Sequence, residues 1–139
     1  MNLSKAEPLA GVITTALSVV LVAGILSFAA PCGVHDDGTV SSCFWAGRAV
    51  LGVGVVAAVL SVVRIFEQDE GERRGLSLAI ALLGVLVAVL PGTLIDLCMM
   101  STMRCHAIMR PFCLVVGVLL ALVGGTDLVR RLLRLRPRQ

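Results

Sequence analysis

Residues 76–97 read LSLAIALLGVLVAVLPGTLIDL, an apolar run with a carboxylate close to its end. About 20 apolar residues in a helix span the roughly 30 Å hydrocarbon core of a bilayer. Similar runs occupy residues 9–30, 44–66 and 111–129. The chain of 139 residues is 58% hydrophobic and 15% charged, with a mean hydropathy of +0.98, which lies outside the balance of soluble domains. The sequence therefore predicts an all-α membrane protein whose residues 1–139 form a single four-helix transmembrane bundle.

The first run has an alternative interpretation as a secretory signal peptide with a cleavage point near residues 27–30. Against it, the run is longer than the roughly 7–15 apolar residues of a signal core. Pro31 is also a poor residue just beyond a cleavage site. We therefore interpret residues 9–30 as a membrane span.

Basic residues gather on one side of the predicted bundle. That side holds the amino end, the connection at residues 67–74 and the tail at residues 130–139. We count Arg64 with the connection. The opposite side is left with three arginines, Arg48, Arg104 and Arg110. By the positive-inside rule, both termini are predicted to be cytoplasmic. The net charge of +3 then reflects topology and contact with anionic lipid, and we expect no nucleic-acid partner.

The two outer loops, residues 31–43 and 98–110, hold four of the five cysteines. In the first loop an Asp-Asp-Gly turn favours the approach of Cys32 to Cys43. Thiols on the non-cytoplasmic face are oxidised, so we expect disulfides there, Cys32 with Cys43 and Cys98 with Cys105, although the connectivity stays open. Such a bridge contributes roughly 2–4 kcal/mol. The fifth cysteine, Cys113, lies inside the fourth run and is expected to be an inert buried thiol.

Two residues at the start of the second run are candidates for partner or ligand contact. Trp45 is predicted to lie at the membrane interface, where aromatic residues are enriched. Arg48 follows within the run, and two interpretations remain open. Its side chain either extends to the outer headgroups, or it faces the bundle and pairs with Asp96 or an anionic ligand.

Small residues recur at every fourth position in three of the runs: Gly54 and Ala58; Gly84, Ala88 and Gly92; Gly117, Ala121 and Gly125. Such faces let helix backbones approach closely in lipid, where helix association has no hydrophobic drive. They predict a compact bundle. Pro91 is predicted to kink the third helix near its outer end. In the first run, Thr14, Thr15 and Ser18 can satisfy their hydroxyls on carbonyls one turn earlier.

The two halves of the chain share a short pattern. Residues 43–48 and 105–110 each read cysteine, four residues and arginine, at the outer end of the second and fourth runs. This pattern predicts two copies of one helical hairpin, related by a parallel duplication.

Two short motifs resemble a known family. Residues 43–49, CFWAGRA, resemble a Cys-His-Trp-x-Gly-x-Ala element, and residues 103–106, MRCH, with Pro111 resemble a Met-x-Cys-His-to-Pro element. Both belong to a bacterial family of small four-span membrane proteins of undefined function. Its members tend to be encoded near exporters of the macrolide or lipoprotein type, so the resemblance implies an accessory role beside an ABC transporter in the plasma membrane. Phe44 stands where the family has histidine, which weakens the case for a ligand site that needs both histidines.

The function favoured by these observations is that of a non-catalytic subunit in a larger membrane complex. Lipid and another membrane protein, such as an ABC transporter permease, are the expected partners, and no cofactor is expected. The sequence shows no pore-lining charge series, nucleotide loop or paired intramembrane carboxylates, so independent transport is not expected. The candidate contact residues are Trp45, Arg48, Arg104, His106 and Arg110.

Two alternatives remain. The layout of two outer cysteine pairs on four spans resembles that of quinone-linked disulfide-forming proteins, although the chain has no Cys-x-x-Cys motif. A soft-metal or haem site could instead form where thiolate, thioether and imidazole groups cluster, a donor set suited to Cu(I). A Cys98–Cys105 disulfide would remove both thiolates from that set. Its residues are Cys98, Met99, Met100, Met103, Cys105, His106 and Met109.

Overall fold

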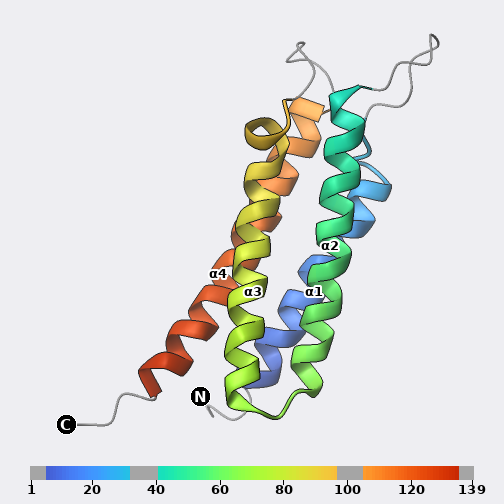
Figure 1. The fold of residues 1–139 in the computed structure, drawn as a ribbon. Helices are drawn as coiled ribbons and strands as arrows, with labels where there is room; N and C mark the ends of the chain where they lie inside the picture. Colours follow the sequence, from blue (N-terminus) through green and yellow to red (C-terminus); the bar gives the residue numbers. More distant parts are fainter. Residues whose placement is uncertain (1–5, 32–40, 97–104, 135–139) are drawn as a thin grey trace.

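A computed structural model describes residues 6–31, 41–96 and 105–134. Four long helices run alternately up and down, side by side (Figure 1). The predicted all-α four-helix bundle is thereby confirmed. The beginning of α1, the α2–α3 connection and the end of α4 all lie at one end of the bundle. The elements are α1 (Ala6–Leu26), α2 (Ser42–Phe66), α3 (Glu70–Val89), the short turns η2 (Leu90–Leu94) and η3 (Cys105–Met109), and α4 (Arg110–Arg134).

The outer surface of the bundle is suited to lipid. Each of the four helices is long and apolar enough to cross a membrane. Large apolar side chains are exposed on every one of them, including Val19, Val56, Leu82 and Leu122. A contiguous apolar exterior of this extent marks a membrane environment, so the chain is a multi-pass membrane protein.

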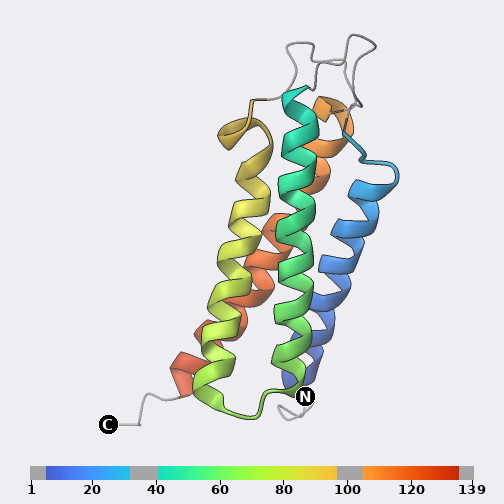
Figure 2. The same ribbon diagram turned by 45° about the vertical axis from the view of Figure 1, so that its right-hand side comes forward.

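The helices associate as two pairs. α1 packs most extensively against α2, and α3 against α4, while the contacts between the pairs are smaller (Figure 2). In the α3–α4 pair, a Cβ atom on Gly84 would lie 2.5 Å from the backbone nitrogen of Ala121. A Cβ atom on Gly117 would lie 2.7 Å from the backbone nitrogen of Ala88. Gly84 and Ala88 of the predicted face of the third span therefore pack against Gly117 and Ala121 of the fourth, as expected for helices that approach closely in lipid. Gly125, predicted on the same face, does not join this contact, because a Cβ atom there would have no neighbour within 4 Å.

The third helix breaks where a kink was predicted. α3 ends at Val89, and Pro91, with ψ 115°, and Gly92, with φ 86°, both leave the helical conformation. The chain then closes on itself, because the N–H of Ile95 donates to the carbonyl of Leu90 at 3.1 Å. Proline has no N–H to continue the helix, and the positive φ is one that glycine adopts without strain. The helix thus stops short of residue 97, the predicted end of the third span.

The other helix bounds also shift from the predicted spans. α1 ends at Leu26 rather than residue 30, whereas α4 continues past residue 129 to Arg134. The predicted back-bonding of the α1 hydroxyls is confirmed. Thr14 donates to the carbonyls of Ala10 and Gly11, Thr15 to that of Gly11, and Ser18 to that of Thr14, at distances of 2.9 to 3.0 Å.

The charged connection between α2 and α3 is held by local hydrogen bonds. The Asp69 carboxylate caps α3, accepting from the backbone N–H groups of Gly71 at 2.7 Å and Glu72 at 3.3 Å. The N–H groups of Asp69 and Gln68 donate to the Glu67 carboxylate, which holds the pKa of Glu67 below its usual value. Residues 70–74 of the predicted connection therefore belong to the beginning of a capped helix.

Replacing Asp69 by alanine is expected to lower the free energy of unfolding by about 1 kcal/mol, because two N–H groups of α3 lose their acceptor. Unfolding in mixed detergent micelles with rising dodecyl sulfate measures this change. Asp69→Ser, which retains a capping oxygen, should lose only a few tenths of that amount. Equal losses in both variants would contradict the capping role.

Candidate functional site: a buried charge network

A single carboxylate joins three helices at the end of the bundle that carries the α2–α3 connection. Asp127 lies on α4, and its side chain is only 12% exposed. Its Oδ2 atom lies 2.8 Å from Nη2 of Arg64 on α2 and 2.8 Å from Nε of Arg131 on α4. The hydroxyl of Ser77 on α3 donates to the same oxygen at 2.9 Å. One oxygen thus gathers three polar partners from α2, α3 and α4.

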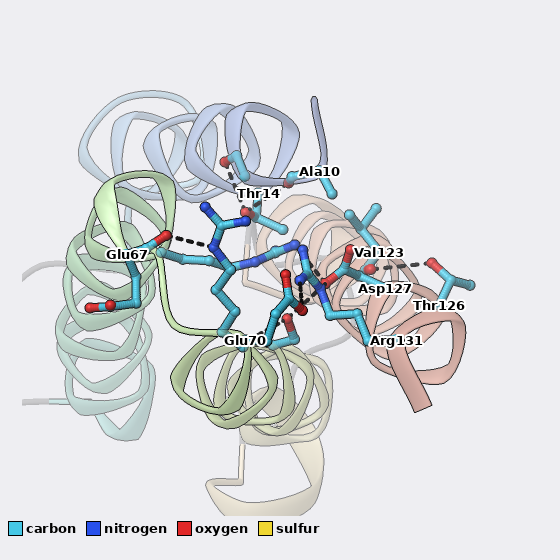
Figure 3. Close-up of polar contacts among 12 residues, drawn as sticks. Ala10, Thr14, Glu67, Glu70, Val123, Thr126, Asp127 and Arg131 are labelled. Carbon is cyan, nitrogen blue, oxygen red and sulfur yellow. Dashed lines mark hydrogen bonds and ion pairs between the residues drawn. The ribbon is translucent and has the colours of Figure 1, made fainter. Parts of the chain in front are cut away.

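The network continues from the core to the surface through Arg131. Its Nη1 atom lies 2.8 Å from Oε2 of Glu70, whose side chain is 52% exposed. Figure 3 shows the side chains of Glu70, Asp127 and Arg131 directed toward one another at this end of the bundle. Arg131 therefore connects the first turn of α3 to the buried carboxylate of α4.

Burial makes these contacts important for stability. Arg64 is 3% exposed and Arg131 is 4% exposed. Removing an ion from water costs several kcal/mol, a cost offset only by close counter-charges and hydrogen bonds. The Asp127 carboxylate gives both guanidinium groups a close counter-charge and accepts a hydrogen bond from Nε of Arg131, whereas Nη1 and Nη2 of Arg64 have no hydrogen-bond partner among the described residues. The arrangement can hold the helices together. Its charged groups are paired with one another, so the network is better suited to a structural role than to binding a ligand.

This network was not predicted from the sequence. Arg64 was expected to belong to the α2–α3 connection, whereas the structure places the residue within α2 and buries it. Asp127 was not singled out at all. A usable signal was present, since a carboxylate inside an apolar run needs a partner, and Arg64 is the cation of another run at the same predicted depth.

The candidate contact residues that lie at the end of the bundle opposite the α2–α3 connection are mainly on its surface. Trp45 is 60% exposed, and Arg48 is exposed with its guanidinium 4.9 Å from the centre of the Phe44 ring. Arg110 is also exposed, and its side chain lies against Gly92. No ion pair between Arg48 and Asp96 occurs in the part of the chain that the structure describes. The remaining candidate, Arg104, lies outside the described residues.

The described cysteines of the two predicted outer loops are buried at the end of the bundle opposite the α2–α3 connection. Cys43, in the first turn of α2, and Cys105, at the start of η3, both have 0% exposure. The two elements lie side by side in Figures 1 and 2. Cys32 and Cys98 are outside the described residues, so both predicted disulfides stay predictions. Cys113 is a fully buried thiol in the hydrophobic core.

The proposed metal donors are only partly described. Met109 is fully buried in the hydrophobic core, and His106 is half-buried in η3. Within residues 6–31, 41–96 and 105–134, no group of three or more histidine, cysteine or acidic side chains is placed to hold a metal. The other methionines of the predicted cluster, Met99, Met100 and Met103, lie outside the described residues.

The fold and the buried network together define a small multi-pass membrane protein with an ionic clamp at one end. A profile of the family described as a domain of unknown function (DUF4418) matches residues 14–130. The match covers most of the chain, so the protein belongs to this family. The predicted membership of a small four-span membrane protein family of undefined function is thereby confirmed. Comparisons with curated proteins and with solved structures gave no match.

Proposed function

We propose that this protein is a non-catalytic accessory subunit of a larger complex in the bacterial plasma membrane. Both termini are cytoplasmic in this proposal, and a transmembrane helix of the partner packs against α4. The observation that carries the proposal is that Gly125, on the side of α4 that α3 leaves uncovered, has no packing neighbour.

Three glycines of α4 lie in different surroundings. Gly117 and Gly124 touch α3, where added Cβ atoms would lie 2.6 Å and 2.9 Å from the nearest backbone atoms. A Cβ atom on Gly125 would have no neighbour within 4 Å. Gly125 instead opens on a groove of about 370 Å³. Almost all of the atoms exposed in this groove are apolar. The groove is lined by Ala121, Leu122, Gly125, Thr126, Val129 and Arg130.

A transmembrane helix is the occupant that this groove favours. In lipid, helices associate where small residues permit close backbone contact and dense packing. Gly125 provides such a position, because α3 leaves it uncovered, and Ala121, which also contacts α3, lies one turn earlier at the edge of the groove. The family resemblance supports an ABC-type exporter permease as the protein that supplies the helix.

The described polar residues support an accessory role over a catalytic one. The buried charges of Arg64, Asp127 and Arg131 contact one another and so stabilise the bundle. Thiol–disulfide exchange requires an accessible sulfur atom, and Cys43 and Cys105 have 0% exposure.

Site-specific photocross-linking tests this proposal. A photoreactive amino acid at position 122, where the leucine is 57% exposed beside the groove, should give one discrete adduct with another membrane protein in native membranes. Adding Gly125→Leu should reduce adduct formation about tenfold or more, because overpacking a helix contact costs roughly 1–3 kcal/mol. Gly52→Leu, which fills space on α2, is the matched control and should leave the adduct unchanged.

Two outcomes would contradict the proposal. One is an adduct whose only protein component is a second copy of this chain. The other is an adduct with a foreign protein that persists undiminished in the Gly125→Leu variant.

A further inference from the structure

A second groove lies at the opposite end of the bundle, between the last turn of α1 and the first half of α2. Its volume is about 500 Å³, within the roughly 300–1,000 Å³ of small-molecule sites. Ile25, Leu26 and Leu51 form apolar walls. On α2, Gly52 keeps the groove open, because a Cβ atom there would meet nothing within 4 Å.

One edge of this groove is positively charged. Arg48 lines it and is exposed, with its guanidinium stacked over Phe44 at 4.9 Å from the ring centre. Arg48 is the charged member of the lining, which is otherwise apolar or glycine. The amino end of α2 adds positive electrostatic potential, because the aligned peptide dipoles of a helix place partial positive charge there. The side chain of the N-cap residue, Ser41, makes no capping hydrogen bond to this end.

Arg48 lies near the end of α2, from which its long side chain can extend to a lipid headgroup. Arg48 lies six residues beyond Ser42, the first residue of α2, or about 9 Å along the helix axis at 1.5 Å per residue. A guanidinium binds phosphate through two parallel hydrogen bonds. The apolar walls on α1 and α2 meanwhile provide the surface that an acyl chain requires.

We infer that this groove binds an anionic phospholipid of the outer leaflet, with its phosphate on Arg48 and one acyl chain over Gly52. Charge complementarity favours this occupant over a zwitterionic lipid, whose own cation would compete for the phosphate. The groove lies at the other end of the bundle from the partner proposed for α4, and its assignment to the outer leaflet rests on the proposed cytoplasmic position of the termini.

Trp45 supplies a built-in probe of this site, because it is the single tryptophan of the chain and its ring meets that of Phe44 edge-on at 5.8 Å. The full chain is reconstituted in phosphatidylcholine vesicles that contain phosphatidylglycerol or phosphatidylcholine with brominated acyl chains. Bromine quenches nearby indole fluorescence. We expect brominated phosphatidylglycerol to occupy the site about fivefold more strongly at equal mole fraction, the factor that one basic residue supplies at an anionic surface.

Variants separate this site from general attraction to the membrane surface. Arg48→Gln should abolish the preference for phosphatidylglycerol, and Arg48→Lys should retain part of it. Gly52→Leu should weaken quenching by both brominated lipids, because the added side chain fills the acyl-chain groove. Arg110→Gln, at another exposed outer arginine, should keep the preference.

A further control fills a neighbouring groove without a charged residue. That groove, of about 330 Å³, is lined by Val19, Val22, Ala23, Leu26, Val55, Ala58 and Val59. Ala58→Leu should leave the lipid preference unchanged. Equal quenching by the two lipids in the wild-type protein would overturn the inference, as would a preference that survives Arg48→Gln but is lost with Arg110→Gln. Helical content by circular dichroism checks that each variant is folded.

Discussion

Replacing Asp127 by alanine is expected to lower the free energy of unfolding by about 3–5 kcal/mol, the usual cost of removing one partner from a buried ion pair. The variant would leave the guanidinium of Arg64, 3% exposed, without its carboxylate. Arg131 would retain Glu70, but Ser77 would lose an acceptor. Unfolding in mixed dodecyl sulfate micelles, followed by circular dichroism, measures the change.

Matched variants distinguish this clamp from a general effect of losing a carboxylate. Asp96→Ala removes an exposed carboxylate at the other end of the bundle and should change stability by less than about 0.5 kcal/mol. Combining Asp127→Ala with Arg64→Met should recover much of the loss, because the unpaired cation is also removed. Equal destabilisation by Asp127→Ala and Asp96→Ala would refute the assigned role of the network.

Replacing Gly84 by alanine is expected to destabilise the bundle by about 1–3 kcal/mol, the usual cost of overpacking. The new Cβ would lie 2.5 Å from the backbone nitrogen of Ala121 and 2.7 Å from the carbonyl oxygen of Gly117. Backbone atoms cannot move aside as a flexible side chain can, so α3 and α4 must separate. The same unfolding titration measures the effect.

Gly75 provides the control for this substitution, because it lies on the same helix. A Cβ atom at position 75 would meet nothing within 4 Å. Gly75→Ala should therefore be neutral or stabilising, since alanine favours a helix over glycine by up to about 1 kcal/mol. If Gly84→Ala were as stable as Gly75→Ala, the close approach of α3 to α4 would be refuted.

Much of the fold was predictable because it depends on local properties of the sequence. The lengths of the apolar runs determine four helices, and the spacing of Gly84 and Gly117 identifies the faces that meet. The break at Pro91 was only partly predictable. Proline alone permits a kink, and complete termination depends on Gly92 taking φ 86° and on Ile95 closing the turn.

The buried network was not predicted, because it depends on how three helices align along their axes. Arg64 and Asp127 are far apart in the sequence, and their similar predicted depth suggests a pair without showing that α2 and α4 bring the two side chains together. Residue order similarly cannot indicate that Arg48 stacks on Phe44 beside an open groove. The cysteine pairings, the parallel duplication and the cytoplasmic position of the termini stay predictions.

The contact between Arg64 and Asp127 also has a consequence for how the protein is made. The chain is synthesised from its amino end, so α2 enters the bilayer before its counter-ion exists. An isolated arginine at the centre of a membrane helix costs roughly 2.5–3.5 kcal/mol on insertion scales, and less near an interface. Because Arg64 lies in the last turn of α2, the nascent hairpin of α1 and α2 bears the smaller of these costs, and a chain truncated before residue 127 would lack the counter-ion of Arg64.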